Sequence, residues 1–403
     1  MKGKRIVIGV SGGIAAYKAA ELVRLLVREE ALVQVAMTAN AARFVSPLTF
    51  GALSGNRVVS HMFDEAAGAM DHISWGQDSD LIIIAPATAN VIAKIAHGIA
   101  DDFLTTMTLA ATARILVCPA MNTRMYENQA TQENLAVLQR RGIFVMEPGA
   151  GQLACRDEGP GRLPEPAEIV DEARSIVSKQ DLAGLQVLVT AGATHEPMDP
   201  VRYISNRSTG KMGYAVATMA RTRGASVKLV TGPTSLPVPR GVEAERVTTA
   251  VEMREAVVKH FAASDIVVMA AAVSDYRPHA TKDQKIKKGP EIQTLELVKN
   301  PDILAELGTL KGKRNCVLVG FAAETEDLLA NAEKKLRDKN LDMIVANDVS
   351  REDAGFAVDT NEVKILFRDG KVESPPLMKK EEVADLVLDQ AKTLREGRSG
   401  HGK

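Results

Sequence analysis

One repeated pattern constrains the fold of this chain more than any other feature. A short apolar run breaks into a loop rich in glycine and hydroxyl residues, and a helical run follows; this happens at residues 7–18 and again at residues 187–223. A strand, such a loop and then a helix are how α/β folds begin a nucleotide site. The repetition predicts two α/β domains with Rossmann-like open parallel sheets, over residues 1–180 and 181–403.

The composition narrows the class of protein. Hydrophobic residues make up 45% and charged residues 25% of 403, which is ordinary for a soluble globular protein. A net charge of −1 gives no field that would attract nucleic acid or an anionic membrane. We find neither an apolar run long enough for a membrane span nor a signal peptide. The sparse cysteines Cys118, Cys155 and Cys316 favour reduced thiols and a cytoplasmic location.

The N-terminal half has the pattern of an open parallel sheet. Apolar runs predict strands at residues 5–10, 31–37, 81–85 and 115–118, and a helix at residues 15–29. Ligands of such sheets bind beyond the carboxyl ends of the strands. The second strand ends in Met37-Thr38-Ala39-Asn40, where a dinucleotide fold usually has an acidic residue for the ribose. The loop therefore favours a phosphate over NAD.

Several polar residues are candidates for the ligand edge of this sheet. Asn90 and Asn122 each follow a strand that ends in Pro-Ala, which places them either in the site or at the cap of the next helix. Residues 149–164 have neither helical nor strand periodicity, and we expect a mobile surface loop. Cys155 in this loop has an arginine beside it, and positive charge lowers the pKa of a thiol. His72 stands alone, and a lone histidine is more often structural than catalytic.

Taken as a set, the motifs of the N-terminal half are specific. They are Ser11-Gly12-Gly13-Ile14-Ala15, His72-Ile73, Pro86-Ala87-Thr88-Ala89-Asn90, Pro119-Ala120-Met121-Asn122 with Met125, and Ala154-Cys155. The set resembles the flavin-containing cysteine decarboxylases, and its order and spacing fit the phosphopantothenoylcysteine decarboxylase branch. The resemblance covers roughly residues 1–178 and implies a flavodoxin-like domain that binds FMN.

This resemblance also implies a site and a mechanism. FMN lies at the strand ends, with its phosphate near Ser11, Gly12, Gly13 and Thr38, and with Ala87, Thr88 and Asn90 also in its site. FMN oxidises the cysteinyl side of the substrate to a thioaldehyde, which makes the loss of CO₂ easy. Cys155 then donates a proton and the flavin returns the hydride. Asn122 anchors the departing carboxylate, and His72 acts as acid/base or orients the thiol. The family further implies homo-oligomers in which a neighbouring subunit completes the flavin site.

The C-terminal half begins after an expected linker at residues 179–184 and lacks a standard phosphate motif. Apolar runs predict strands at residues 185–189, 226–231, 265–269, 316–321 and 343–346, a hairpin over 362–373, and helices at 214–223, 327–339 and 380–394 before a frayed tail. The loop over residues 205–213 is neither a Walker A motif nor GxGxxG, but it could cradle phosphate at a helix start. Lys285-Ile286-Lys287-Lys288 is either a solvated cluster or a triphosphate clamp.

The polar motifs of this half cover residues 205–213, 271–277, 285–288, 299–302, 320–325 and 346–348. They resemble phosphopantothenate–cysteine ligase, and the whole chain is similar to the bifunctional coenzyme A biosynthesis family from end to end. The family activates the carboxylate of 4′-phosphopantothenate with CTP as an acyl-cytidylate, and the amine of cysteine then displaces CMP. Lysines and Mg²⁺ stabilise the charge on the phosphates.

The ligase resemblance assigns roles to individual residues. Asn206 holds the acyl intermediate, and Lys285 assists its formation or breakdown. Asp275 and Lys287 contact the nucleotide or the metal, with Asp275 as a candidate Mg²⁺ ligand. The resemblance also places two further residues near the nucleotide, Phe321 and Lys339.

Two other interpretations stay open from the sequence alone. An NAD-dependent oxidoreductase with two Rossmann-like halves would need an acidic residue after Met37, which the sequence lacks. A binding or regulatory flavoprotein with a degenerate C-terminal half would need Asn206 or Lys285 to be dispensable. The resemblance favours the bifunctional enzyme, because the product of its C-terminal half is the substrate of its N-terminal half.

Overall fold

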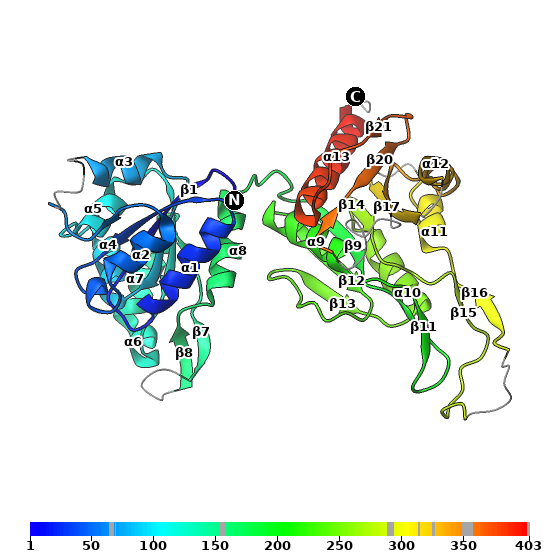
Figure 1. Ribbon diagram of the computed structural model, residues 1–403, viewed down its shortest axis with the longest axis horizontal. Coiled ribbons are helices and arrows are strands. Elements are labelled where there is room, and N and C mark those ends of the chain that lie inside the picture. Colours follow the sequence, from blue (N-terminus) through cyan, green and yellow to red (C-terminus); the bar gives the residue numbers. More distant parts are fainter. Residues whose placement is uncertain are drawn as a thin grey trace. The chain divides into compact units, whose positions relative to one another are not determined.

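The computed structural model describes residues 1–63, 68, 70–152, 158–287, 294–312, 315–324, 327–348 and 358–400. The chain divides into two compact units, Met1–Ser178 and Lys179–Lys403, each built on its own sheet (Figure 1). We call them the N-terminal and the C-terminal unit. The predicted fold class, α/β with open parallel sheets, is confirmed.

The N-terminal unit contains a six-stranded sheet in the order β3-β2-β1-β4-β5-β6, and all five pairings are parallel. Its strands are β1 (Arg5–Val10), β2 (Leu32–Met37), β3 (Val58–Val59), β4 (Leu81–Ala87), β5 (Arg114–Pro119) and β6 (Phe144–Val145). The strand order reverses direction between β1 and β4. Such a switch point leaves a crevice outside the carboxyl ends of the strands, where open α/β sheets bind ligands.

Helices cover both faces of this sheet, which explains why all seven residues of β4 are buried. One face packs against α1 (Ala16–Arg28), α2 (Pro47–Ser54) and α8 (Pro166–Val177). The other face packs against α3 (Asp71–Asp78), α4 (Ala89–His97), α5 (Phe103–Ala110) and α7 (Gln129–Arg140). Two short elements, η1 (Ala41–Arg43) and α6 (Thr123–Glu127), follow β2 and β5 at the carboxyl edge.

The C-terminal unit contains an eight-stranded sheet in the order β13-β12-β9-β14-β17-β18-β20-β21. Its strands are β9 (Gln186–Ala191), β12 (Ser226–Thr231), β13 (Glu243–Arg246), β14 (Ile266–Met269), β17 (Val317–Glu324), β18 (Met343–Asp348), β20 (Val363–Phe367) and β21 (Val372–Glu373). The first six strands in that order pair in parallel, and β20 and β21 add an antiparallel edge. The predicted hairpin over residues 362–373 is therefore confirmed.

Helices also cover both faces of the second sheet. One face packs against α9 (Lys211–Thr222) and α13 (Lys380–Gly400), and the other against α10 (Ala250–Phe261), α11 (Ile303–Leu310) and α12 (Leu328–Asp338). Small antiparallel pairs extend from the two units: β7 (Gly149–Gln152) with β8 (Glu158–Arg162), β10 (His195–Pro197) with β11 (Tyr203–Ser205), β15 (Tyr276–Pro278) with β16 (Leu297–Lys299), and β19 (Thr360–Asn361) with β22 (Met378–Lys379).

Three local predictions were wrong. The ends of residues 149–164 pair as β7 and β8, because a backbone ladder needs no side-chain periodicity. Strand β17 continues beyond Phe321 to Glu324. Helix α13 runs to Gly400 with its final turns tied down, since Arg395 pairs with Asp265 at 2.7 Å. The boundary between the units falls at the start of the expected linker over residues 179–184, within which Leu182 is fully buried.

Candidate active sites at the strand ends

Ser11 joins the carboxyl ends of β1 and β4 in the N-terminal unit. Its Oγ donates to the carbonyl of Pro86 at 2.6 Å and accepts from the N–H of Thr88 at 3.0 Å. The residue is fully buried. A serine hydroxyl has a single proton to donate, so in this structure that proton is committed to Pro86. Ser11 therefore stabilises the predicted FMN loop through its bonds to Pro86 and Thr88, and it does not offer its O–H to a phosphate.

Gly12 lies where only a glycine fits. A Cβ at this position would be 2.3 Å from Cβ of Asn40 and 2.8 Å from its carbonyl carbon. Gly12, Asn40, Arg43 and Phe44 line a hollow of about 470 Å³. Gly13 is next to Thr88, at 3.4 Å from its methyl carbon if a Cβ is added. The structure thus brings together Gly12, Gly13 and Thr88 at the switch point of the sheet.

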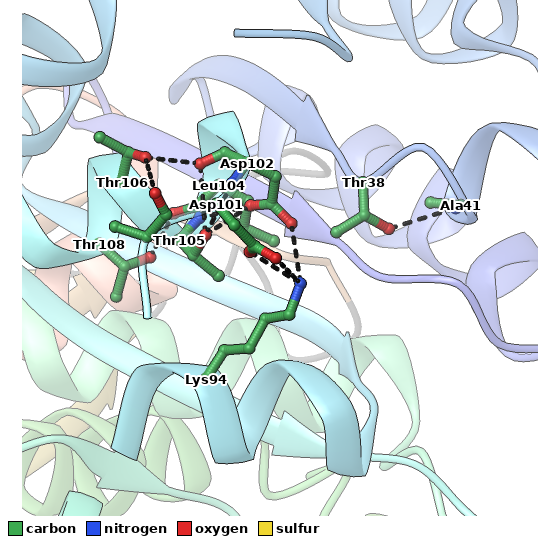
Figure 2. Close-up of polar contacts among 10 residues, drawn as sticks. Thr38, Ala41, Lys94, Asp101, Asp102, Leu104, Thr105, Thr106 and Thr108 are labelled. Atoms are coloured by element: carbon green, nitrogen blue, oxygen red, sulfur yellow. Dashed lines mark hydrogen bonds and ion pairs between the residues drawn. The ribbon is translucent and has the colours of Figure 1, made fainter. Parts of the chain in front are cut away.

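The hydroxyl of Thr38 is the donor that Ser11 does not provide. Thr38 is buried at the end of β2, and its Oγ1 accepts from the N–H of Ala41 at 3.2 Å (Figure 2). Within the described part of the chain, no acceptor takes the O–H of Thr38. Its proton is therefore available to an anion at the start of η1.

Figure 2 also shows a cluster of polar side chains between α4 and α5 that bond to one another and to the local backbone. Asp102 caps α5 through a reciprocal pair with Thr105, and Lys94 pairs with Asp101 at 2.8 Å. Thr106 donates to the carbonyl of Asp102 at 2.7 Å, and Thr108 donates to that of Leu104 at 2.7 Å. These hydroxyls stabilise the start of α5, so the role of the cluster is structural.

The two asparagines at this edge behave differently. Asn122 is the N-cap of α6, and its Oδ1 accepts from the N–H of Arg124 at 2.8 Å, so it caps a helix and also lies at the carboxyl edge of the sheet. Asn90 is an exposed second residue of α4, whose N-cap is Thr88. Strand β8 packs beside Asn122, because a Cβ on Gly161 would lie 2.3 Å from the carbonyl oxygen of Met121. Ala87, also predicted for the FMN site, ends β4 fully buried. Cys155 lies outside the described residues.

His72 does not lie with these residues. It is the second residue of α3, and Ser74 and Trp75 of that helix line a cavity of about 330 Å³ together with Arg5 and Leu32. Arg5 and Leu32 begin β1 and β2, so this cavity is at the amino edge of the sheet. Figure 1 shows α3 at the opposite end of the unit from α6 and β7–β8. Helix α3, which carries His72, therefore borders the amino side of the sheet, away from α6 and β8.

In the C-terminal unit, the loops after β9 and β14 are joined by hydrogen bonds. The N–H of Ala272 donates to the carbonyl of Gly192 at 2.8 Å, and the N–H of Ser274 donates to the buried hydroxyl of Thr194 at 3.0 Å. Asn206 reaches across and donates through Nδ2 to the carbonyl of Val273 at 3.1 Å. Asn206 was predicted from the sequence, whereas Thr194, whose buried hydroxyl fixes the loop that Asn206 contacts, was not.

Three glycines form a close-packed cradle at the start of α9. A Cβ on Gly232 would lie 2.2 Å from the carbonyl oxygen of Ala193, and one on Gly192 would lie 3.1 Å from that of Gly232. Gly210, the N-cap of α9, has φ 83° and approaches Gly192. Backbone N–H groups at the start of a helix favour anions. The geometry suits the predicted phosphate cradle.

The remaining predicted ligase residues are spread along this edge. Asp275 is exposed, and its carbonyl accepts from the N–H of Asn300 at 2.8 Å. Lys339 pairs with Asp302, the N-cap of α11, at 2.9 Å. Phe321 lies half-buried in β17.

Lys285 and Lys287 are exposed, on the segment after β15. Among the described residues, no three His, Cys, Asp or Glu side chains gather as a metal site.

Comparison with known proteins follows this division. A flavoprotein family model matches residues 1–178, and the model of the DNA/pantothenate metabolism flavoprotein C-terminal domain matches residues 182–394. Proteins named coenzyme A biosynthesis bifunctional protein CoaBC match nearly the full length. The chain is 48% identical to that of Vibrio cholerae over 391 residues, 96% of this chain and 98% of the relative. It is also 48% identical to those of Bacillus subtilis and Escherichia coli K12, each over 399 residues and 98% of both chains.

The chain belongs to the family of bifunctional coenzyme A biosynthesis proteins. The predicted resemblance is confirmed, and membership in this family does not favour the NAD-dependent oxidoreductase. The crystal structure of the C-terminal domain of a CoaBC protein is 42% identical, with a TM-score of 0.47, and covers 54% of this chain and 100% of that one. No helix in the described part of the chain is long and apolar enough to span a membrane.

Proposed function

We propose that the two units catalyse consecutive steps. The C-terminal unit condenses 4′-phosphopantothenate with cysteine using CTP, and the N-terminal unit decarboxylates the resulting 4′-phosphopantothenoylcysteine to 4′-phosphopantetheine using FMN. The observation that carries this proposal is the end-to-end match to the bifunctional family. Each unit also has one open parallel sheet, the type of sheet that binds nucleotides at the carboxyl ends of its strands. We assign residues 1–180 to the decarboxylase and residues 181–403 to the ligase.

FMN fits the carboxyl edge of the N-terminal unit. Without a side chain, Gly12 leaves the hollow beside Asn40 open, and the free O–H of Thr38 can donate to the phosphate. Gly13, Ala87, Thr88 and Asn90 complete the site, and Ser11 holds Thr88 in place. Bound FMN supplies a reversible acceptor for a hydride from the substrate.

The chain's own residues handle the carboxylate and the protons. Asn122 anchors the departing carboxylate, and Cys155 donates the proton that replaces CO₂ on carbon. Because α3, the helix that carries His72, borders the amino side of its own sheet, we propose a homo-oligomer in which His72 of a neighbouring subunit completes the flavin site. The monomer would then lack part of its decarboxylase site.

The ligase chemistry needs positive charge near the phosphates. The carboxylate of 4′-phosphopantothenate attacks the α-phosphate of CTP and pyrophosphate leaves; the amine of cysteine then attacks the acyl carbon and CMP leaves. Lys285 and Lys287, with Mg²⁺ held partly by Asp275, stabilise the charge that accumulates in the first step. Asn206 holds the acyl-cytidylate.

Phe321 and Lys339 complete the nucleotide surroundings at this edge. The pairing of Lys339 with Asp302 means that its ammonium must exchange a carboxylate partner for the nucleotide. We propose a cytoplasmic location for the enzyme, in line with the buried thiols of Cys118 and Cys316, which form no disulfide with each other.

The direct test is an assay of the purified full chain with 4′-phosphopantothenate, cysteine, CTP and Mg²⁺, following phosphopantothenoylcysteine, phosphopantetheine and the flavin absorbance. A Cys155→Ser variant should lose decarboxylation by about 10²- to 10⁴-fold and retain amide formation. A Lys285→Ala variant should lose amide formation by about 10²- to 10³-fold and still decarboxylate added phosphopantothenoylcysteine. A colourless protein that FMN does not reconstitute, or indifference to CTP, would contradict the corresponding half of the proposal.

A further inference from the structure

The segment that carries Lys285 and Lys287 is exposed, yet it is fastened to one neighbour. Both lysines are exposed, while Ile286 between them is half-buried. The segment approaches the loop between β10 and β11 at two points before the lysines. Thr281 donates through Oγ1 to the carbonyl of Pro197 at 3.1 Å, and the N–H of Lys282 donates to the carbonyl of Met198 at 2.9 Å.

Asp199 in the β10–β11 loop makes the contact that fixes the lysines. Its Oδ2 accepts from the N–H of Ile286 at 3.0 Å and from Arg202 Nε at 2.9 Å. Its Oδ1 accepts from the N–H groups of Val201 and Arg202, each at 2.8 Å. The side chain of Asp199 is fully buried, so these bonds are not shared with water.

Arg202 holds the other backbone polar group of Ile286, its carbonyl. Its Nη2 donates to the carbonyl of Ile286 at 2.6 Å and to Asp199 Oδ2 at 2.5 Å. Both backbone polar groups of Ile286 are thereby held, the N–H by a carboxylate and the carbonyl by a guanidinium. Fixing these two groups orients the peptide planes that lead to Lys285 and to Lys287.

We propose that Asp199 and Arg202 are positioning residues of the ligase, a latch that holds Lys285 and Lys287 against the triphosphate of CTP. This inference rests on the proposed function for the role of the lysines. Ile286, which is half-buried, is held through both backbone groups, while Lys285 and Lys287 on either side of it are exposed. Anchoring Ile286 therefore restricts both lysines while leaving their side chains open to a polyanion.

The electrostatics of Asp199 fit this role. Burial alone would raise the pKa of Asp199, but hydrogen bonds from Arg202 and from the N–H of Ile286 hold it well below its usual range. The carboxylate thus stays charged across the working pH of the enzyme. A charge-assisted hydrogen bond is about twice as strong as a neutral one, which suits an anchor for an exposed segment.

A second arginine in this unit provides a matched control. Arg254 pairs with Glu306 through Nε and Nη2, both at 2.6 Å, and its side chain is 39% exposed against 43% for Arg202. This pair connects α10 to α11 and does not contact Ile286. Replacing Arg254 therefore removes an equivalent ion pair without touching the lysine segment.

The first test needs no substrate. The native full chains of the wild type, Asp199→Asn, Arg202→Ala and Arg254→Ala are digested with trypsin under limiting conditions, and cleavage after Lys285 and Lys287 is followed by mass spectrometry. We expect these two cuts to be at least tenfold faster in Asp199→Asn and Arg202→Ala and unchanged in Arg254→Ala, with each digestion run well below the thermal midpoint of its variant because loss of a buried ion pair lowers that midpoint. Equal rates in all four chains would overturn the latch.

The second test separates positioning from general structural support. We expect Asp199→Asn to lower kcat/KM for CTP by about 10²-fold, as misplacement of catalytic groups does, with KM for cysteine and the decarboxylase rate of the same chain unchanged. In a Lys285→Ala, Lys287→Ala background the same change should cost less than about twofold, because groups that act through each other are not additive. Arg202→Lys should lose less kcat/KM for CTP than Arg202→Ala, since lysine keeps the positive charge.

The outcomes distinguish the latch from the proposed function. A full additional loss in the double-lysine background would assign Asp199 a purely structural role and overturn the positioning role. If the wild type consumes no CTP, the proposed function fails and the catalytic part of the latch fails with it, while faster cleavage in Asp199→Asn would still establish the physical contact.

Discussion

The two units differ in what they bury. Among the described residues, every buried polar side chain of the N-terminal unit is a hydroxyl: Ser11, Thr38, Thr105, Thr108 and Thr131. The C-terminal unit buries charged groups as well, including Glu196, Asp199, Arg223, Lys311, Asp342 and Lys380. Buried charges must be paired and hydrogen-bonded, whereas a hydroxyl is satisfied by a nearby carbonyl.

The segments that connect strands to helices also differ between the two units, in their length. In the N-terminal unit, residues 11–15 join β1 to α1 and Thr88 alone joins β4 to α4. In the C-terminal unit, residues 192–210 join β9 to α9 and residues 270–302 join β14 to α11. Short connections suit the flavin edge that we propose for the N-terminal unit. Long connections, one of them holding the Asp199–Arg202 ion pair, suit the proposed ligase site, which must admit several substrates.

The largest expected effects come from filling the two glycine positions that close these edges. Gly12→Ala and Gly232→Ala each place a Cβ within about 2.3 Å of neighbouring atoms, Asn40 in one case and the carbonyl of Ala193 in the other. Overpacking of this kind costs about 1–3 kcal/mol, equivalent to a loss of affinity of about fivefold to about 10²-fold where it falls on ligand binding. We expect Gly12→Ala to lose flavin and Gly232→Ala to lose CTP binding, measured by flavin absorbance and by calorimetric titration with CTP.

Two other glycines provide the controls for that comparison. Gly51 in α2 has its nearest contact at 3.6 Å and Gly397 in α13 has none within 4 Å, so alanine fits at both. Neither change should affect either ligand. Loss of CTP binding in Gly12→Ala, or of flavin in Gly232→Ala, would show that the two edges are not independent and would break the comparison.

The sequence predicted the central strands of both sheets well, because each is a nearly continuous apolar run bounded by turns, but it did not predict the edge strands β3, β6 and β13. It missed the pairing of β7 with β8 and the extension of α13, since neither depends on an apolar pattern. The β7–β8 pair rests on backbone bonds around glycines. The last turns of α13 rest on contacts between distant parts of the chain, such as Arg398 with the carbonyl of Cys316 at 2.7 Å.

The candidate sites were predictable as lists of residues but not as geometry. Motif resemblance named Ser11, while only the structure showed that its proton is committed to Pro86. It named Lys285 and Lys287, but not Asp199 and Arg202, which hold the residue between them. Nothing in Met198-Asp199-Pro200-Val201-Arg202 reveals a contact with residues more than eighty positions later.

A more moderate effect separates the two hydroxyls at the flavin edge. Thr38→Val should weaken flavin binding about tenfold, because it removes a hydrogen-bond donor to a charged phosphate. Ser11→Ala should instead destabilise the unit by about 1–3 kcal/mol, because it leaves the N–H of Thr88 without its acceptor. Flavin titration and urea unfolding measure the two effects. Thr108→Val, a buried hydroxyl in the α5 cluster, should leave flavin affinity unchanged (Figure 2). A Ser11→Ala chain of wild-type stability would remove its supporting role.

The smallest effect appears only in acid and concerns the buried charge of the C-terminal unit. Hydrogen bonding to Arg223, which is 3% exposed, lowers the pKa of Asp181 to about 2. A folded pKa below the unfolded value of about 3.9 contributes stability that is complete above that value and is lost as the pH falls towards 2. Urea unfolding of the C-terminal unit should therefore lose roughly 1–2 kcal/mol over this range, and Asp181→Asn should flatten that slope. Glu396→Gln, on the far side of Lys392, should leave it unchanged. If the unfolding free energy of Asp181→Asn fell with pH as steeply as that of the wild type, the pairing of Asp181 with the buried Arg223 would not explain the acid sensitivity of this unit.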